Sequence, residues 1–439
     1  MEALVTQFLT RALVLAAGVA AMTGCKGESA TSPAADCSKL PLAPASARVD
    51  LVQPTFSSPL NITNPLFPIS RLHSAVLLGT VDGAPLRVET TLLPNPKTIT
   101  WNGRQVQTHE SQYVAFLNGR VDEVALDWYG QADDGSVWYF GEDVFNFENG
   151  TLADRDGTWL VERDGPLAMI MPASPKVGDV FRPENICGLV FEEVTVKSVG
   201  ETVNGPTGPV SGAMIANELH NDGSREDKTF APGYGEFATG SGGNIEALAL
   251  AVPTDALTSA PPAALNTLQT GALSIFDAAL TGAWPEVTTT LGVMASAWNG
   301  YRAGSPPMLA TQMTTALAAL TSAASSRNAA AARQAAIDVA RATLDFRLRH
   351  RPPAEIDRAR FDLWAAQIIV DAAANNSAGV RGDVTTLEYV RNRFAHTLTS
   401  SVRGQLDAIL GELRTAADAR NVTVAEAAAI RLRATLASV

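Results

Sequence analysis

The first half of the chain shows the alternating pattern of apolar and polar positions that is typical of β-strands. Between residues 49 and 252, short stretches rich in β-branched and aromatic residues are separated by turn residues. Pairs such as Asn102-Gly103 and Asn118-Gly119 tolerate the positive φ angles that tight hairpins require. The pattern therefore predicts an antiparallel β meander, folded as a curved sheet, an open barrel or a sandwich.

The second half changes to the helical period. Val380, Val384, Leu387 and Phe394 lie along one helical stripe, and similar stripes precede and follow it. Alanine is abundant, which allows close helix–helix contacts, so residues 253–439 are predicted to form a bundle of about five to seven helices. Thr423 and Glu426 predict a capping box at the start of the last helix. The whole chain is thus expected to be an α+β protein with two domains.

The distribution of charge supports this division. Acidic residues outnumber basic ones by 30 to 16 up to residue 252, whereas the remainder has 15 acidic and 17 basic residues. The formal net charge of −12 argues against nucleic acid as the main partner. The apolar content of 46% and charged content of 18% are typical of globular proteins rather than of disordered or multi-spanning membrane proteins.

The N-terminal segment predicts export and lipid attachment. Arg11 precedes a short apolar run that ends at Met22, and Thr23-Gly24-Cys25 follows. Such an arrangement is typical of a secretory signal, and the run is too short to be a stable membrane span. The ending resembles a bacterial lipobox, which implies cleavage after residues 1–24 and a lipid on the thiol of Cys25. Residues 25–48 are predicted to be a flexible tether, because they are rich in Ser, Ala, Pro and Thr.

This signal predicts a protein anchored in the cell membrane or outer membrane, facing the periplasm or the cell exterior. In such an oxidising compartment the two remaining cysteines, Cys37 and Cys187, are expected to form a disulfide. The alternative is two unpaired thiols.

Recognisable catalytic motifs are missing from the sequence. It contains no Walker A loop, no His-Glu-x-x-His and no Gly-x-Ser-x-Gly, and its five histidines are scattered singly. We therefore expect a binding module rather than an enzyme, with no cofactor. Calcium is the alternative, because hairpin-loop carboxylates offer the hard oxygen ligands that Ca²⁺ prefers. The candidate ligands are Asp127, Asp133, Asp134 and Glu142. In the competing interpretation Asp133-Asp134-Gly135 is an ordinary turn.

Aromatic residues are interleaved with these carboxylates. Trp128, Trp138, Tyr139 and Phe140 would line the concave face of a curved sheet and hold an apolar ligand, a lipid or an unidentified envelope protein. The alternative is ordinary cross-strand packing. A hydrolase of envelope polysaccharide, using Asp127 with Glu142, is the rival function, and a non-catalytic scaffold is the third.

The segment from Asp127 to Glu142 also resembles a stretch found in uncharacterised secreted proteins and lipoproteins of bacteria. Asn64-Pro-Leu-Phe-Pro68 before it and the segment from Glu226 to Gly235 after it look like parts of the same domain. The resemblance covers residues 60 to 240 approximately and implies no established activity. Its general appearance is similar to the half-open β-barrels of periplasmic lipid and lipoprotein carriers.

Overall fold

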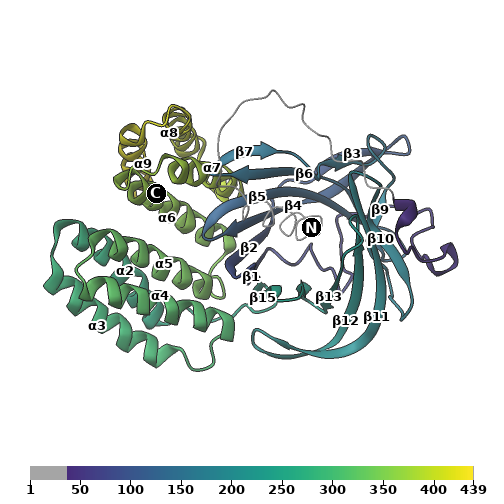
Figure 1. Ribbon diagram of the computed structural model, residues 1–439, viewed down its shortest axis with the longest axis horizontal. Helices are drawn as coiled ribbons and strands as arrows, with labels where there is room; N and C mark the ends of the chain where they lie inside the picture. Colours follow the sequence, from purple (N-terminus) through teal and green to yellow (C-terminus); the bar gives the residue numbers. More distant parts are fainter. Residues whose placement is uncertain (1–36, 439) are drawn as a thin grey trace, which may run out of the picture.

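A computed structural model describes residues 37–438. Within this range an antiparallel sheet precedes a group of helices, which confirms the predicted α+β arrangement (Figure 1). The predicted signal peptide, the lipidation site at Cys25 and the first part of the tether lie outside the described residues. Among the helices that are described, none is long and apolar enough to cross a membrane.

The sheet contains 15 strands. The strands of its first half are β1 (Ser74–Val81), β2 (Ala84–Leu92), β3 (Lys97–Trp101), β4 (Arg104–Leu117), β5 (Arg120–Gln131), β6 (Val137–Glu148), β7 (Thr151–Asp154) and β8 (Trp159–Leu160). Those of its second half are β9 (Ala168–Met171), β10 (Val180–Ile186), β11 (Val190–Gly205), β12 (Gly208–His220), β13 (Arg225–Ala231), β14 (Gly235–Ser241) and β15 (Asn244–Val252).

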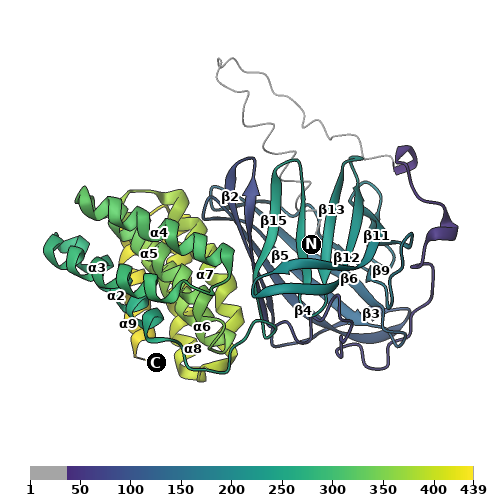
Figure 2. The same cartoon turned by 90° about the horizontal axis from the view of Figure 1, so that it is seen from below.

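Hydrogen bonding runs through one continuous curved sheet rather than through the two sheets of a sandwich. The order is β10-β11-β12-β13-β14-β15-β1-β2-β4-β5-β6-β7, so within residues 37–438 the sheet is not closed by pairing. β9 pairs with β6 and lies beside β10, which brings the two ends of the sheet near each other. The strands therefore curve around a common interior (Figure 2).

Local turn chemistry explains the meander. Asn102 and Asn118 have φ angles of 52° and 51°, and the glycines after them are also at positive φ. This left-handed pair is the geometry of a two-residue hairpin turn, which Asn-Gly adopts with little strain. The hairpin predictions at these positions are therefore confirmed.

Eight α-helices follow among the described residues, one more than the upper end of the expected range. They are α2 (Ala263–Thr281), α3 (Trp284–Tyr301), α4 (Pro307–Ser325), α5 (Ala329–Arg347), α6 (Pro353–Ala373), α7 (Ser377–Phe394), α8 (Ser400–Asp418) and α9 (Val422–Ala437). The predicted capping box of α9 is wrong. Asn421 is the N-cap, and its side chain accepts a hydrogen bond from the Val424 amide.

The helices pack directly on the outer face of the sheet. Val76 and Leu250 belong to one hydrophobic core with residues of α2 to α6, and Val114 and Phe116 belong to another with residues of α6 to α9. The Phe116 ring stacks on Trp364, with centroids 5.2 Å apart. The helices therefore cover the part of the outer face formed by β15, β1, β4 and β5, and the opposite face borders the interior.

The predicted disulfide between Cys37 and Cys187 is confirmed, with a Cα–Cα distance of 5.8 Å. Cys37 begins a short 3₁₀ helix (Cys37–Lys39), and Cys187 follows β10 directly. The bridge ties the start of the described chain to one end of the sheet.

Candidate functional site

Carboxylates gather on the inner face of the sheet. Residues directly opposite each other on paired strands point to the same face. Asp127 lies opposite Glu142, Glu184 opposite Glu192, and Glu218 opposite Glu226. Glu184 helps to raise the pKa of Glu142, so these two carboxyl groups lie near each other although β6 and β10 are not paired. Their proximity therefore closes a carboxylate band across the interior.

We call this group of inner-face carboxylates the interior band. It contains nine residues, and none of them is more than 9% exposed. Its members are Glu123, Asp127, Glu142, Glu184, Glu192, Glu218, Glu226, Glu236 and Glu246. Burial raises the pKa of Tyr113 well above its usual value, and the charges of Glu246, Glu123 and Glu236 add to this effect. The band thus continues from β10 through β15 and returns to β5.

Few basic groups compensate this charge. In the described part of the chain, the ion pairs of the band are made by His220 and Lys228. The Lys228 ammonium lies 3.2 Å from Glu236 and 3.8 Å from Glu218. Both carboxylate oxygens of Glu192 and both of Glu218 accept no hydrogen bond from any residue that the structure describes. A buried carboxylate without donors is unfavourable unless it takes up a proton or meets a cation.

Some carboxyl groups of the band avoid an unpaired buried charge by taking up a proton. Burial raises the pKa of Asp127 to about 7, and the neighbouring Glu142 carboxyl contributes. Burial likewise raises the pKa of Glu142 to about 8, with a contribution from Glu184. The Tyr139 hydroxyl donates to Asp127 Oδ1 at 2.7 Å, which opposes part of the shift of Asp127. These carboxyls therefore hold protons near neutral pH.

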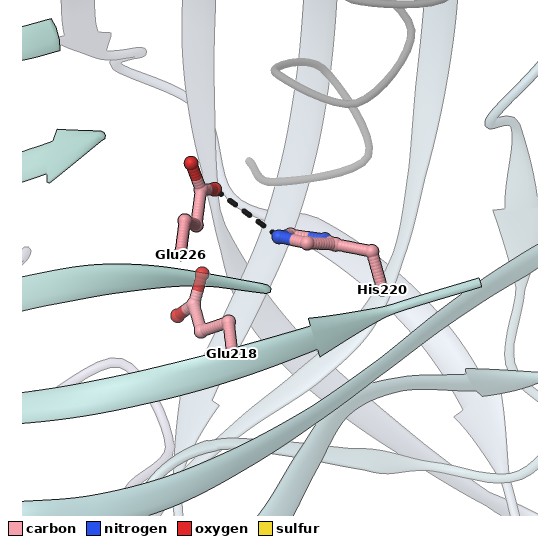
Figure 3. A group of neighbouring side chains, drawn as sticks. All are labelled: Glu218, His220 and Glu226. Carbon is pink, nitrogen blue, oxygen red and sulfur yellow. Dashed lines mark ion pairs between the residues drawn. The ribbon is translucent and has the colours of Figure 1, made fainter. Parts of the chain in front are cut away.

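A histidine and two glutamates lie close together within the band (Figure 3). One potential ligand atom from each of Glu218, His220 and Glu226 lies within 4.8 Å of the others. His220 Nε2 is 3.2 Å from Glu226 Oε1, and His220 Nδ1 is 3.4 Å from Glu192 Oε1. Burial lowers the pKa of His220, but the adjacent carboxylates of Glu226 and Glu218 raise it more, so the net shift is upward.

The four aromatic residues that the sequence singled out are buried, at 2% exposure or less. The ammonium of Lys97 lies 3.4 Å from the centroid of the Trp128 ring, and Phe140 packs against Phe56. Trp138 donates from Nε1 to Ser136. Of the four, Tyr139 reaches the interior band, through its hydroxyl contact with Asp127. Packing against neighbouring strands and loops accounts for the burial of the other three.

The four proposed calcium ligands divide into two pairs. Asp127 and Glu142 lie opposite each other in the band. Asp133 and Asp134 lie in the β5–β6 turn. There Asp133 accepts hydrogen bonds from Thr55 and Ser57, and Asp134 accepts from Ser136. The structure therefore does not bring these four carboxylates together, and the turn interpretation accounts for Asp133 and Asp134.

Sequence reasoning missed the second side of the band, which contains Glu184, Glu192, Glu218, His220 and Glu226. A signal was present in the strand pattern. Glu218 and His220 occupy alternate positions of one strand, so they share a face, and Glu192 interrupts the apolar alternation of Val190 and Val194. Charged residues at positions where a strand is otherwise apolar indicate a polar interior.

An apolar cleft adjoins the band. It is lined by Phe67, Leu72, Leu77 and Tyr129, among others, and Glu236 contributes a carboxylate. Tyr129 stacks on Tyr139, with ring centroids 4.7 Å apart, and so connects the cleft to Asp127.

The chain matches no known protein-family model, and no curated protein sequence shows significant similarity to it. The resemblance to secreted bacterial lipoproteins therefore stays a prediction from the sequence.

Proposed function

We propose that this protein is a cell-envelope binding module, tethered by a lipid on Cys25, that holds a cationic ligand inside its curved sheet. The supporting observation is the interior band, in which nine buried carboxylates face one another across the sheet. Within residues 37–438, nothing donates a hydrogen bond to a carboxylate oxygen of Glu192 or Glu218. A cation among them would replace the missing donors and reduce the mutual repulsion.

A binding role receives more support than hydrolysis of polysaccharide. Glycosidases keep their two carboxyl groups about 5 to 9.5 Å apart, so that the glycosidic bond fits between them. Asp127 and Glu142 are instead both buried, at 0% and 1% exposure, and their pKa values are raised to about 7 and about 8. An enclosed pair that holds protons near neutral pH does not place one ionised carboxylate beside a substrate.

An apolar ligand is a second candidate. The cleft at Phe67, Leu72 and Leu77 would accept an aliphatic group, and Glu236 at its wall would attract a positive charge. This cleft supports the apolar-ligand hypothesis better than Trp128, Trp138 and Phe140, because those three rings are enclosed by their own neighbours.

Isothermal titration calorimetry of the purified full chain tests the proposal, with spermidine as the organic cation and Zn²⁺ as the metal. We expect at least one of them to bind, and Glu184→Gln to weaken its binding by about tenfold, because it removes one charge of the band. Glu201→Gln, on an exposed part of β11, is the matched control.

The proposal fails if neither cation binds. It also fails if Glu184→Gln binds as tightly as the wild-type protein and the Glu201→Gln control do. A fluorescent fatty-acid probe serves as the third ligand. Binding of this probe alone would favour the apolar-ligand candidate.

A further inference from the structure

The hairpin between β12 and β13 brings ligand-type side chains to one place. Glu218 and Glu226 are directly opposite each other, and His220 is two residues beyond Glu218 on the same strand face. The His220 amide donates to the Ser224 carbonyl at 3.0 Å, and the Gly223 amide donates to the His220 carbonyl at 2.9 Å. These bonds fix the backbone at the end of the hairpin and so the position from which the His220 side chain extends.

The spacing of these groups suits a metal ion. Zn²⁺ binds imidazole nitrogen and carboxylate oxygen at about 2.0 to 2.2 Å, so its ligand atoms stand roughly 3.3 to 3.6 Å apart. His220 Nε2 and Glu226 Oε1 are 3.2 Å apart, and one atom of Glu218 completes a group within 4.8 Å. The widest spacing in the group exceeds that of the ligands around a bound Zn²⁺, so binding would draw the glutamate side chains inward.

Three of the four carboxylate oxygens of Glu218 and Glu226 accept no hydrogen bond from residues 37–438. Glu218 is fully buried, and neither of its oxygens accepts a hydrogen bond. Glu226 Oε1 also accepts none, although the residue is only 4% exposed. Lys228 lies 3.8 Å from Glu218, beyond hydrogen-bonding distance. Figure 3 shows a Glu226 oxygen directed at the imidazole, with the Glu218 carboxylate close to both.

A fourth residue is placed to orient the imidazole. Glu192 lies directly opposite His220 on β11, and its Oε1 is 3.4 Å from Nδ1. When Nε2 binds a metal ion, the remaining ring proton is on Nδ1, and Glu192 Oε1 lies where it would accept that proton and hold the ring in place. Histidine ligands of metals are commonly held by a carboxylate in this manner.

We propose that Glu218, His220 and Glu226 bind one divalent transition-metal ion of the Zn²⁺ or Mn²⁺ class, with Glu192 as a positioning residue. One imidazole with carboxylates suits these ions, whereas Ca²⁺ and Mg²⁺ favour oxygen ligands throughout. Three protein ligands leave a coordination position for water or a small ligand. This inference rests on the proposed function, because it names the cation of the interior band.

Equilibrium dialysis of the chelator-treated full chain against Zn²⁺, with metal content measured by mass spectrometry, tests this site. We expect one tightly bound ion per chain, lost or weakened at least tenfold in His220→Ala and Glu218→Gln. Glu192→Gln should weaken binding by about 10- to 100-fold, as expected for a residue that orients a ligand. His396→Ala, an exposed histidine on the helical side, is the control.

Cobalt substitution gives a second measurement. Bound Co²⁺ should show visible absorption bands in the wild-type protein, and these should change in His220→Ala, because a nitrogen ligand is removed. If His220→Ala does not fold, as judged by circular dichroism, the near-isosteric Glu218→Gln decides the test.

The site is refuted if the wild-type protein binds no Zn²⁺ or Mn²⁺, or if Glu218→Gln binds the ion as tightly as the wild-type protein does. Spermidine binding that persists in either case would leave the proposed cation-binding function intact. Loss of both spermidine and metal binding would refute the function as well.

Discussion

Asp127 and Glu142 face each other on neighbouring strands, and both are buried almost completely. Two ionised carboxylates at such short range repel strongly in a poorly solvated interior, so a proton between them is favoured. Tyr139 supplies one donor, and Glu184 extends the pair to β10. The stability of the fold therefore depends on whether these inner-face carboxyl groups are protonated.

Stability of the metal-free protein should fall as pH rises. Burial raises the pKa of Asp127 from 3.8 to about 7 and that of Glu142 from 4.5 to about 8. Between the unfolded and folded pKa values the native state binds more protons than the unfolded state, so the free energy of unfolding decreases with pH. We expect the melting temperature, followed by circular dichroism with chelator present, to drop between about pH 4 and pH 8.

Glu142→Gln provides the control for this prediction. The amide keeps the size of the side chain and does not ionise, so the variant should lose less stability over the same pH range. An identical pH dependence in both proteins would show that Glu142 does not titrate as described.

At the scale of single elements, the hairpins were predictable and the register of distant strands was not. Asn102-Gly103 and Asn118-Gly119 carry a local turn signal, since few other residue pairs tolerate two positive φ angles. Glu192, Glu218 and Glu226 come from three strands, and only pairing among those strands brings them together. Periodicity shows the face on which a residue lies, but not which strand will be its neighbour.

The start of α9 is a second feature that the sequence pattern alone did not predict correctly. Asn421 and Thr423 are both acceptable N-cap residues, and Glu426 made Thr423 the better match to a capping box. The helix begins earlier, because Asn421 accepts the Val424 amide while Ala425, Ala428 and Leu432 are buried. Packing of the apolar face thus determines which of two similar local N-cap signals is used.

The disulfide between Cys37 and Cys187 was predictable for a simple reason. With Cys25 assigned to lipid, two cysteines remained in an exported chain, so one pairing was possible.

The interior band was not predictable to the same extent. Asp127 and Glu142 were recognised as a potential pair, but the band was completed by β10 to β15, where the carboxylates are widely spaced in sequence.

At the scale of the whole molecule, buried ion pairs join the sheet to the helices. Arg393 of α7 lies 2.6 Å from Glu89 of β2, and Arg360 of α6 lies 3.7 Å from the same carboxylate. Arg87 pairs with Asp345 of α5 at 2.7 Å. Burial opposes ionisation of Glu89, but Arg360, Arg87 and Arg393 hold its pKa well below the usual value.

Replacing Glu89 should weaken this junction. Glu89→Gln would leave Arg360 and Arg393 buried beside fewer negative charges, and breaking such a buried network costs about 3 to 5 kcal/mol. Urea unfolding followed by tryptophan fluorescence and far-ultraviolet circular dichroism should show this loss. Both probes should report one transition, because sheet and helices share two hydrophobic cores.

The exposed variant Glu201→Gln should unfold at the same urea concentration as the wild-type protein. A Glu89→Gln protein of unchanged stability would show that the junction contributes little. Two separate wild-type transitions would instead indicate that sheet and helices unfold independently.

Whether a cation occupies the interior band can be measured by native mass spectrometry of the protein purified from its own membranes, in mild detergent and without chelator. We expect an added mass that corresponds to a cation, lost from His220→Ala or Glu218→Gln and retained in His396→Ala. A wild-type chain that carries only the predicted lipid at Cys25, with no cation bound, would contradict this expectation.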